Sequence, residues 1–289
     1  MRGRSRVPGE TWKRLLVATL GVFVPVSLAL AAATGYHIIG EIKVGGEGGW
    51  DYLTVDSAAR RLYVSHATHV VVVDLDANKV VGDIPDTPGV HGIAIVPELN
   101  RGFISNGRGN SVTIFDLKTL KATGTVTTGE NPDSIRFDAV SGRVFTFNGR
   151  SKSSTAIDAK SGNVAGDDRA AGKPEFSVAD GKGKIYVNIE DTNEIVEIDA
   201  AKATVTKEVR ADRMRRSVGS GDRPEEPPAV LRLLEIASWR FPEPDAGKVI
   251  ATPAIGAGSD GAAFDAGTGY AFSSNGDGTM TVVAQTGGK

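Results

Sequence analysis

Ser134-Ile135-Arg136-Phe137-Asp138 is a short strand-like stretch that ends on an aspartate, and related stretches occur along most of the chain. They end at positions 56, 97, 138, 180 and 265, so the successive intervals are 41, 41, 42 and 85 residues. The last interval holds two periods. A fixed period of this length is the sequence sign of a repeat protein, in which each repeat is one small structural unit.

Each repeat shows a pattern of four strands. In the first repeat, Tyr52 to Asp56 is followed by Arg61 to Ser65, Val70 to Asp74 and Lys79 to Gly82. These stretches are short, rich in β-branched residues and bounded by turn residues. Four strands in about 42 residues are typical of a propeller blade, which needs neighbouring blades on both faces. A β-sandwich is the alternative, but it would not require constant spacing. We therefore expect an all-β β-propeller over residues 35–289.

Several strings resemble the YVTN-repeat, YncE-like family of β-propellers, over roughly residues 36–209 and 245–284. The resemblance implies a seven-bladed propeller that is secreted or periplasmic, with no single activity shared across the family. About six blade positions are visible here, and the C-terminus is expected to be truncated after a third strand. The strings include Trp50-Asp51-Tyr52, Val90-His91-Gly92-Ile93-Ala94, Ser105-Asn106-Gly107-Arg108 and Ser273-Ser274-Asn275-Gly276-Asp277.

Residues 210–242 break the strand pattern, so the fifth blade position is expected to be disrupted. The stretch is rich in Arg, Pro and Glu, and Ala229 to Trp239 has helical rather than alternating periodicity, so a helix from Pro228 to Trp239 is expected. The repeat spacing is nevertheless preserved across it. One hypothesis is a frameshift product, because shifting permitted codons by one nucleotide over Arg215 to Leu233 can give a string like the other repeats. The alternative is a genuine family-specific insertion.

Residues 1–34 read as a signal peptide. Arginines and lysines precede the apolar run from Leu15 to Leu30, and Ala29-Leu30-Ala31 offers small residues for cleavage. An uncleaved anchor is the alternative, although Pro25 disfavours a stable span. We expect a periplasmic or secreted protein with no membrane span in the mature chain.

Composition excludes several classes of function. The 33 Lys and Arg residues against 35 Asp and Glu residues give a formal charge of −2, which is no strong signal for nucleic-acid binding. Without cysteine, the chain has no thiolate nucleophile, iron–sulfur cluster or Cys-ligated zinc. It also lacks a Gly-x-Ser-x-Gly elbow with a plausible triad and a His-Glu-x-x-His metal motif.

The candidate ligand site is the mouth of the propeller channel. Loops that enter the innermost strands line that mouth, and the residues there could hold a polar small molecule or a peptide side chain. The alternative is that they cap blades and bind channel water. The ligand-binding candidates are Trp50, Asp51, Tyr52, His66, His91, Asn131, Asp133, Glu175 and Asp260.

Three histidines are candidate metal ligands. His66, His69 and His91 could approach one another, with Asp51 as an oxygen donor. A solvated turn is nevertheless the expected place of His66 and His69, so no metal and no cofactor is predicted. The Asn-Gly loops that follow the second strands are interpreted as turns in which Asn and Gly supply positive φ.

These observations predict a non-catalytic binding or scaffold propeller whose ligand or protein partner, still unknown, lies at the channel face. A propeller enzyme, either a lactonase-like hydrolase or a metal- or quinone-dependent oxidoreductase, is one alternative, supported by fold analogy alone. A surface adhesion or partner-recognition module is the other.

Overall fold

The computed structural model describes residues 36–170, 172–192, 194–210, 255–256, 259–265 and 267–284. Within these residues all strands belong to five antiparallel sheets in the compact unit Ile39–Lys289. Four sheets have four strands and the last has three, and in each the strands pair in sequence order. The chain is an all-β β-propeller with five blades in this described part, which confirms the predicted fold class.

The strands follow the predicted repeats closely. Blade 1 contains β1 (Trp50–Asp56), β2 (Arg61–His66), β3 (His69–Asp74) and β4 (Lys79–Ile84). Blade 2 contains β5 (Val90–Val96), the short 3-10 helix η1 (Pro97–Leu99), β6 (Arg101–Asn106), β7 (Ser111–Asp116) and β8 (Ala122–Thr127). Blade 3 contains β9 (Pro132–Asp138), β10 (Arg143–Asn148), β11 (Ser153–Asp158) and β12 (Val164–Arg169).

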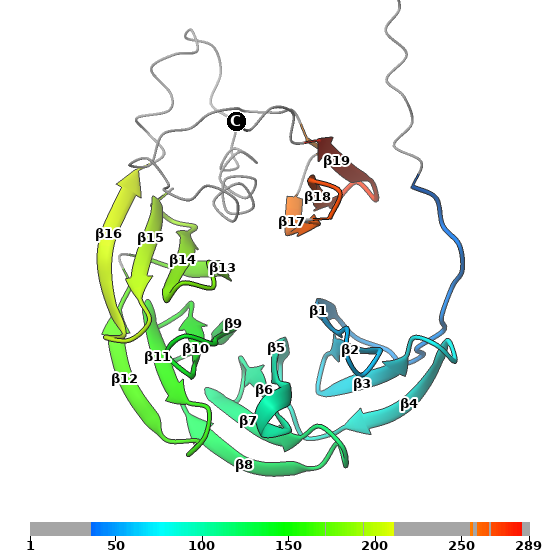
Figure 1. Ribbon diagram of the computed structural model, residues 1–289, viewed down its shortest axis with the longest axis horizontal. Coiled ribbons are helices and arrows are strands. Elements are labelled where there is room, and N and C mark those ends of the chain that lie inside the picture. The colour runs from blue at the N-terminus through cyan, green and yellow to red at the C-terminus, as the bar shows by residue number, and fades with distance from the viewer. Residues whose placement is uncertain are drawn as a thin grey trace, which may run out of the picture. The chain divides into compact units, whose positions relative to one another are not determined.

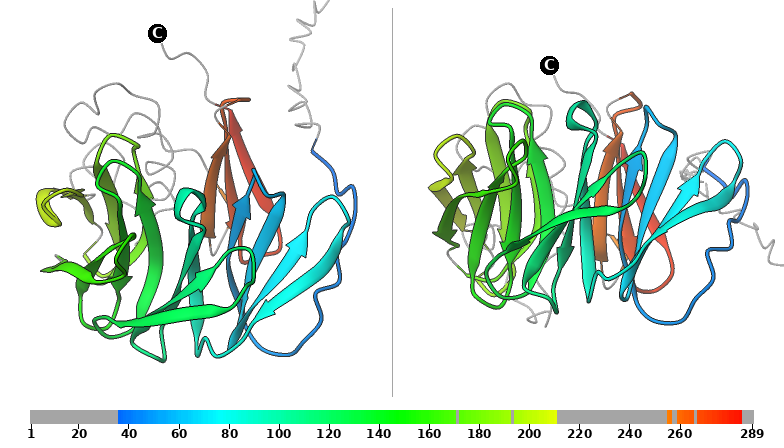
Figure 2. Two further views of the ribbon diagram at one scale, coloured as in Figure 1. Left: turned by 60° about the horizontal axis from the view of Figure 1, so that its bottom comes forward. Right: turned by 90° about the horizontal axis from the view of Figure 1, so that it is seen from below.

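Blade 4 contains β13 (Pro174–Ala179), β14 (Lys184–Ile189), β15 (Glu194–Asp199) and β16 (Thr204–Arg210). The fifth sheet contains β17 (Ser259–Asp265), β18 (Tyr270–Asn275) and β19 (Met280–Ala284). In blades 1 to 4 the first strand lies on the inner side and the fourth on the outer side (Figure 1). Each of these sheets twists strongly between those two strands (Figure 2).

Neighbouring blades meet through their first strands. β1 contacts β5, β5 contacts β9, and β9 contacts β13, so equivalent ends of these strands lie side by side. The hydrophobic core is divided accordingly into layers between blades. One layer joins blades 1 and 2 around Tyr63 and Phe115, whose rings pack 5.8 Å apart at 53°. Other layers join blades 2 and 3, and blades 3 and 4. Because both faces of β3 and β7 are covered, four consecutive residues in each strand are buried.

The recurring aspartates that define the repeat form turns. The Asp56 carboxylate accepts the backbone N–H of Ala59 at 2.9 Å, and Asp138 accepts that of Ser141 at 2.7 Å. Asp116, which ends a third strand, accepts the N–H groups of Lys118 and Thr119 at 3.0 and 2.8 Å. A short carboxylate that bonds the backbone two or three residues ahead stabilises a tight turn. The regularly spaced aspartates therefore mark turns between antiparallel strands.

Arginines at the start of the second strands connect successive blades. Arg61 of blade 1 donates from Nη1 to the Leu117 carbonyl in the β7–β8 turn of blade 2 at 2.7 Å. Arg101 of blade 2 donates to the carbonyls of Ala159 and Lys160 in blade 3 at 3.2 and 2.7 Å. Arg143 of blade 3 donates to those of Ala200 and Ala201 in blade 4 at 3.2 and 2.7 Å. Each arginine thus binds the blade that follows its own.

Several sequence predictions lie outside the described residues. They are the signal peptide over 1–34, the helical stretch from Pro228 to Trp239 with nearly all of the aberrant segment 210–242, and the truncated end of the chain. Of the aberrant segment only Arg210 is described, as the last residue of β16. Among the described residues, no helix has the length and apolar character needed to cross a membrane.

Candidate functional site

The second residue of each first strand carries a polar side chain. Since the starts of β1, β5, β9 and β13 lie side by side, this repeat position forms one group at the channel mouth. Asp260 occupies the same position in β17, but its side chain is outside the described part. The four described members are Asp51, His91, Asp133 and Glu175.

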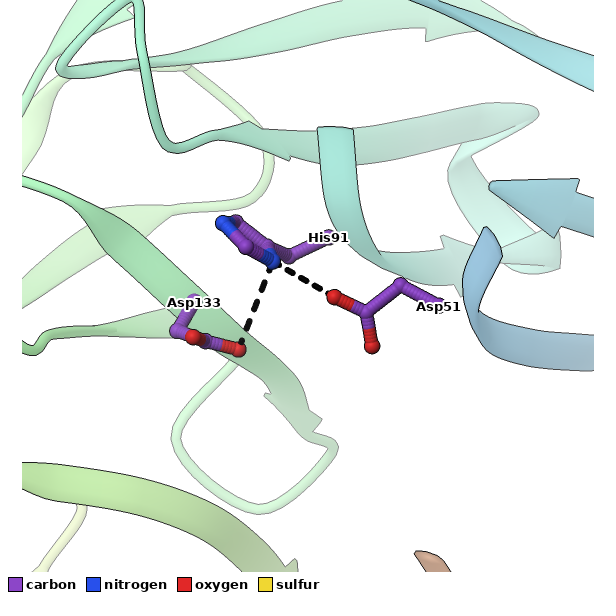
Figure 3. A group of neighbouring side chains, drawn as sticks. All are labelled: Asp51, His91 and Asp133. Carbon is purple, nitrogen blue, oxygen red and sulfur yellow. Dashed lines mark hydrogen bonds and ion pairs between the residues drawn. The ribbon is translucent and has the colours of Figure 1, made fainter. Parts of the chain in front are cut away.

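Three of these side chains converge, as Figure 3 shows. The Nδ1 atom of His91 lies 2.5 Å from a carboxylate oxygen of Asp51 and 3.9 Å from one of Asp133. One ligand atom from each of the three residues lies within 4.8 Å of the other two. The contacts therefore join blades 1, 2 and 3 through a carboxylate–imidazole–carboxylate group, which we call the mouth triad.

The surroundings of the triad shift its proton equilibria. Burial raises the pKa of Asp133 to about 7; His91 opposes this shift, whereas Glu175 and Asp51 add to it. The hydrogen bond to Asp51 raises the pKa of His91, burial opposes the rise, and Asp133 supports it. Both shifts favour the protonated form. The positive charge near Asp133 is thus too small to offset the effect of burial on its carboxylate.

Tyr52 lies next to the same carboxylates. Burial raises its pKa well above the usual value, and Asp133, Glu175 and Asp51 raise it further, so all three acidic groups are close enough to act on the phenol. Its ring packs on Phe176 of blade 4, with the centroids 6.0 Å apart. The Tyr52 backbone carbonyl accepts the hydroxyl of Ser65 at 3.1 Å, which fixes this residue against β2.

Glu175 and Asn131 have neighbours of their own. Lys173 lies 3.6 Å from the Glu175 carboxylate and also pairs with Glu190, so it partly neutralises this side of the mouth.

The backbone N–H of Asn131 donates to the Asn110 side-chain carbonyl at 2.9 Å, and the backbone carbonyl of Asn131 accepts the Gly149 N–H at 2.9 Å. Asn131 therefore ties the β8–β9 connection to both neighbouring turns.

Gly107 is a site residue that the sequence interpretation missed. The loop Asn106-Gly107-Arg108-Gly109-Asn110 was expected to take positive φ from its Asn and Gly residues, and Asn110 does so with φ of 46°, whereas Gly107 does not have positive φ. Gly107 is needed for space: a Cβ atom there would lie 2.5 Å from Nε2 of His91 and 3.0 Å from Oδ1 of Asn131. Its backbone thus holds one edge of the imidazole, which leaves Nδ1 facing the two carboxylates.

Replacing Gly107 with alanine should displace His91 and weaken cation binding at the mouth by about 10-fold or more, because small misplacements of binding groups are costly. The displacement can be measured as a changed His91 imidazole signal in NMR spectra. Gly124→Ala in β8 is the matched control, because its Cβ would meet only Ile114 Cδ1, at 4.0 Å. An unchanged His91 signal in the Gly107 variant would contradict this assignment.

Trp50, His66 and His69 form a separate group within blade 1. The Trp50 and His66 rings stack with centroids 3.8 Å apart and planes at 5°, and His66 is fully buried. His66 Nδ1 lies 3.1 Å from His69 Nε2, which lies 3.6 Å from Asp83. The expected solvated position is therefore wrong for His66, because the indole and the 46–49 loop cover it. Neither histidine belongs to the metal-ligand group around His91.

Comparison with known proteins bears on the fold alone. No family model and no curated protein sequence matches the chain. Among solved structures, a chain of Kuenenia stuttgartiensis hydrazine synthase is similar with a TM-score of 0.55 at 12% identity, over 88% of this chain and 99% of that one. U3-55K is similar with a TM-score of 0.50 at 9% identity, over 57% of this chain and 53% of that one. The chain thus shares the β-propeller fold with these structures.

Proposed function

We propose that this chain is an exported, non-catalytic binding propeller of the YVTN-repeat type, located in the periplasm or secreted. Its ligand is a cation, either a free ion or a small molecule or peptide side chain with a positive charge. The ligand occupies the channel mouth at the mouth triad, beside Tyr52 and Glu175.

The convergence of acidic groups from different blades carries this proposal. Asp51, Asp133 and Glu175 act electrostatically on the same phenol and the same imidazole. Carboxylates that gather in a partly buried place raise one another's pKa, and a bound cation relieves that repulsion. This convergence agrees with the contacts between β1 and β5, β5 and β9, and β9 and β13, which bring the same repeat position of blades 1 to 4 together.

The environment of His91 favours binding over proton-transfer catalysis. Its Nδ1 faces Asp51, and its Nε2 lies against the backbone of Gly107. A general base needs a ring nitrogen within reach of the substrate proton. In the described arrangement both ring nitrogens of His91 already face protein atoms. The imidazole is therefore better placed to orient a bound ligand than to transfer a proton.

Calorimetric titration with spermidine as an organic cation tests the proposal. The full chain should bind spermidine, and Asp51→Asn should weaken binding by about 10-fold, the effect of losing about 1.4 kcal/mol of binding free energy. Asp83→Asn removes an exposed carboxylate from β4 and should leave affinity unchanged, which makes it the matched control. Equal affinities for Asp51→Asn and Asp83→Asn would place any spermidine binding elsewhere and contradict the proposal.

A further inference from the structure

We propose that Asp51, His91 and Asp133 form a binding site for one divalent transition-metal ion, with Zn²⁺ the best match to the donor set. The inference deepens the proposed function and rests on it, since it names the class of cation that occupies the mouth. One nitrogen and two oxygen atoms from three blades already lie within 4.8 Å of one another.

The donor set selects the kind of ion. Imidazole nitrogen suits zinc and its transition-metal neighbours, whereas calcium and magnesium prefer oxygen ligands throughout. Three protein ligands leave a fourth tetrahedral position for water, as in zinc sites that keep an open position. The chain has no cysteine, so a nitrogen and oxygen site is the form of zinc site available to it.

Charge and proton balance are consistent with such an ion. His91 Nδ1 must give up any proton that it shares with Asp51, and the freed lone pair then binds the metal. Any proton on Asp133 likewise leaves to solvent, because a metal ligand has to be deprotonated. Two carboxylates then neutralise the two positive charges of the ion. The bound ion supplies the positive charge that the buried Asp133 lacks.

Tyr52 lies beside the proposed site. Burial raises the pKa of its phenol, and Asp133, Glu175 and Asp51 are close enough to raise that pKa further. Gly107 contributes as well, since its backbone fixes the opposite edge of the imidazole and directs Nδ1 toward both carboxylates. The ligands are thus preorganised by neighbouring blades.

Titration of the EDTA-treated, dialysed full chain with zinc chloride tests the inference. One equivalent of zinc should bind. His91→Gln and Asp133→Asn should each weaken zinc binding by about 100-fold, because removing a metal ligand lowers the affinity at least as much as removing a residue that only orients such a ligand. His69→Gln and Asp83→Asn replace the same residue types outside the mouth triad and should bind as the parent chain does. Cobalt chloride should give a visible absorption band in the parent and control chains that both mouth variants lack. Circular dichroism of each variant verifies that the sheets have formed.

The outcomes separate this inference from the proposed function. Zinc affinity that is equal in the His91→Gln and His69→Gln variants would overturn the site, because binding would then be adventitious. Spermidine binding that depends on Asp51, without zinc binding, would overturn the metal inference and leave the proposed function standing. Failure of both probes to bind would overturn both. Should His91→Gln fail to fold, Asp133→Asn decides the test, since it keeps the size of the side chain and removes only its charge.

Discussion

Asp133→Asn should stabilise the metal-free chain at pH 8 by up to about 4 kcal/mol. The folded-state pKa of Asp133 is about 7, compared with an ordinary value of 3.8. Each unit of such a shift corresponds to about 1.4 kcal/mol. Because the folded state holds this proton more tightly than the unfolded state, stability decreases as pH rises from the ordinary pKa through the raised one. Asparagine occupies the same space without a charge and avoids that loss.

Urea unfolding at pH 5 and pH 8, with chelator present, measures the effect. The parent chain should be less stable at pH 8, and the difference should shrink in Asp133→Asn. His91 contributes in the same direction, since a raised histidine pKa gives stability that is lost as pH rises above it. Asp83→Asn should keep the parent's pH dependence. Parallel pH profiles for the parent and Asp133→Asn would show that Asp133 does not hold its proton in the folded chain.

Phe115→Ala should lower the free energy of unfolding by about 3–5 kcal/mol, the usual cost of removing a buried phenylalanine ring. Phe115 is fully buried in β7 and packs on Tyr63 of blade 1. It also lies over Gly102, where a Cβ would come within 2.1 Å of the ring. The ring thus fills the layer between blades 1 and 2, and alanine would leave a cavity that the paired strands cannot easily close.

Chemical denaturation followed by circular dichroism gives the size of this loss. Val140→Ala is the control, because Val140 is apolar but 61% exposed in the turn after β9. Its substitution should change stability by no more than about 0.5 kcal/mol. A loss below about 1 kcal/mol for Phe115→Ala would mean that the two blades are not held together by this layer.

The fold could be predicted because its signals are local. An aspartate that opens a turn, followed by a basic residue and an alternating strand, repeats about every 42 residues, and no long-range contact is needed to detect it. Asp51, His91, Asp133, Glu175 and Asp260 were candidates for a related reason, since each stands at the start of a first strand. Their common repeat position follows from the same comparison of the repeats with one another.

The grouping of side chains in space could not be predicted in this way. From the sequence, His66, His69 and His91 could approach one another, but His66 and His69 flank the β2–β3 turn, while His91 is the second residue of β5. Gly107 looked like an ordinary turn glycine, because the imidazole that it contacts comes from a different strand. The raised pKa of Asp133 depends on residues from three other blades, at a spacing that only the assembled sheets define.

The inter-blade arginines all point from one blade to the blade that follows it in the sequence. Arg61, Arg101 and Arg143 each reach forward along the chain, toward a turn that is synthesised nearly sixty residues later. A chain emerging from the ribosome can therefore complete one blade and present its guanidinium before the next blade exists. Each new blade on arrival meets one guanidinium donor on its predecessor and supplies the carbonyl acceptors for it, so blade addition during translation has a fixed order.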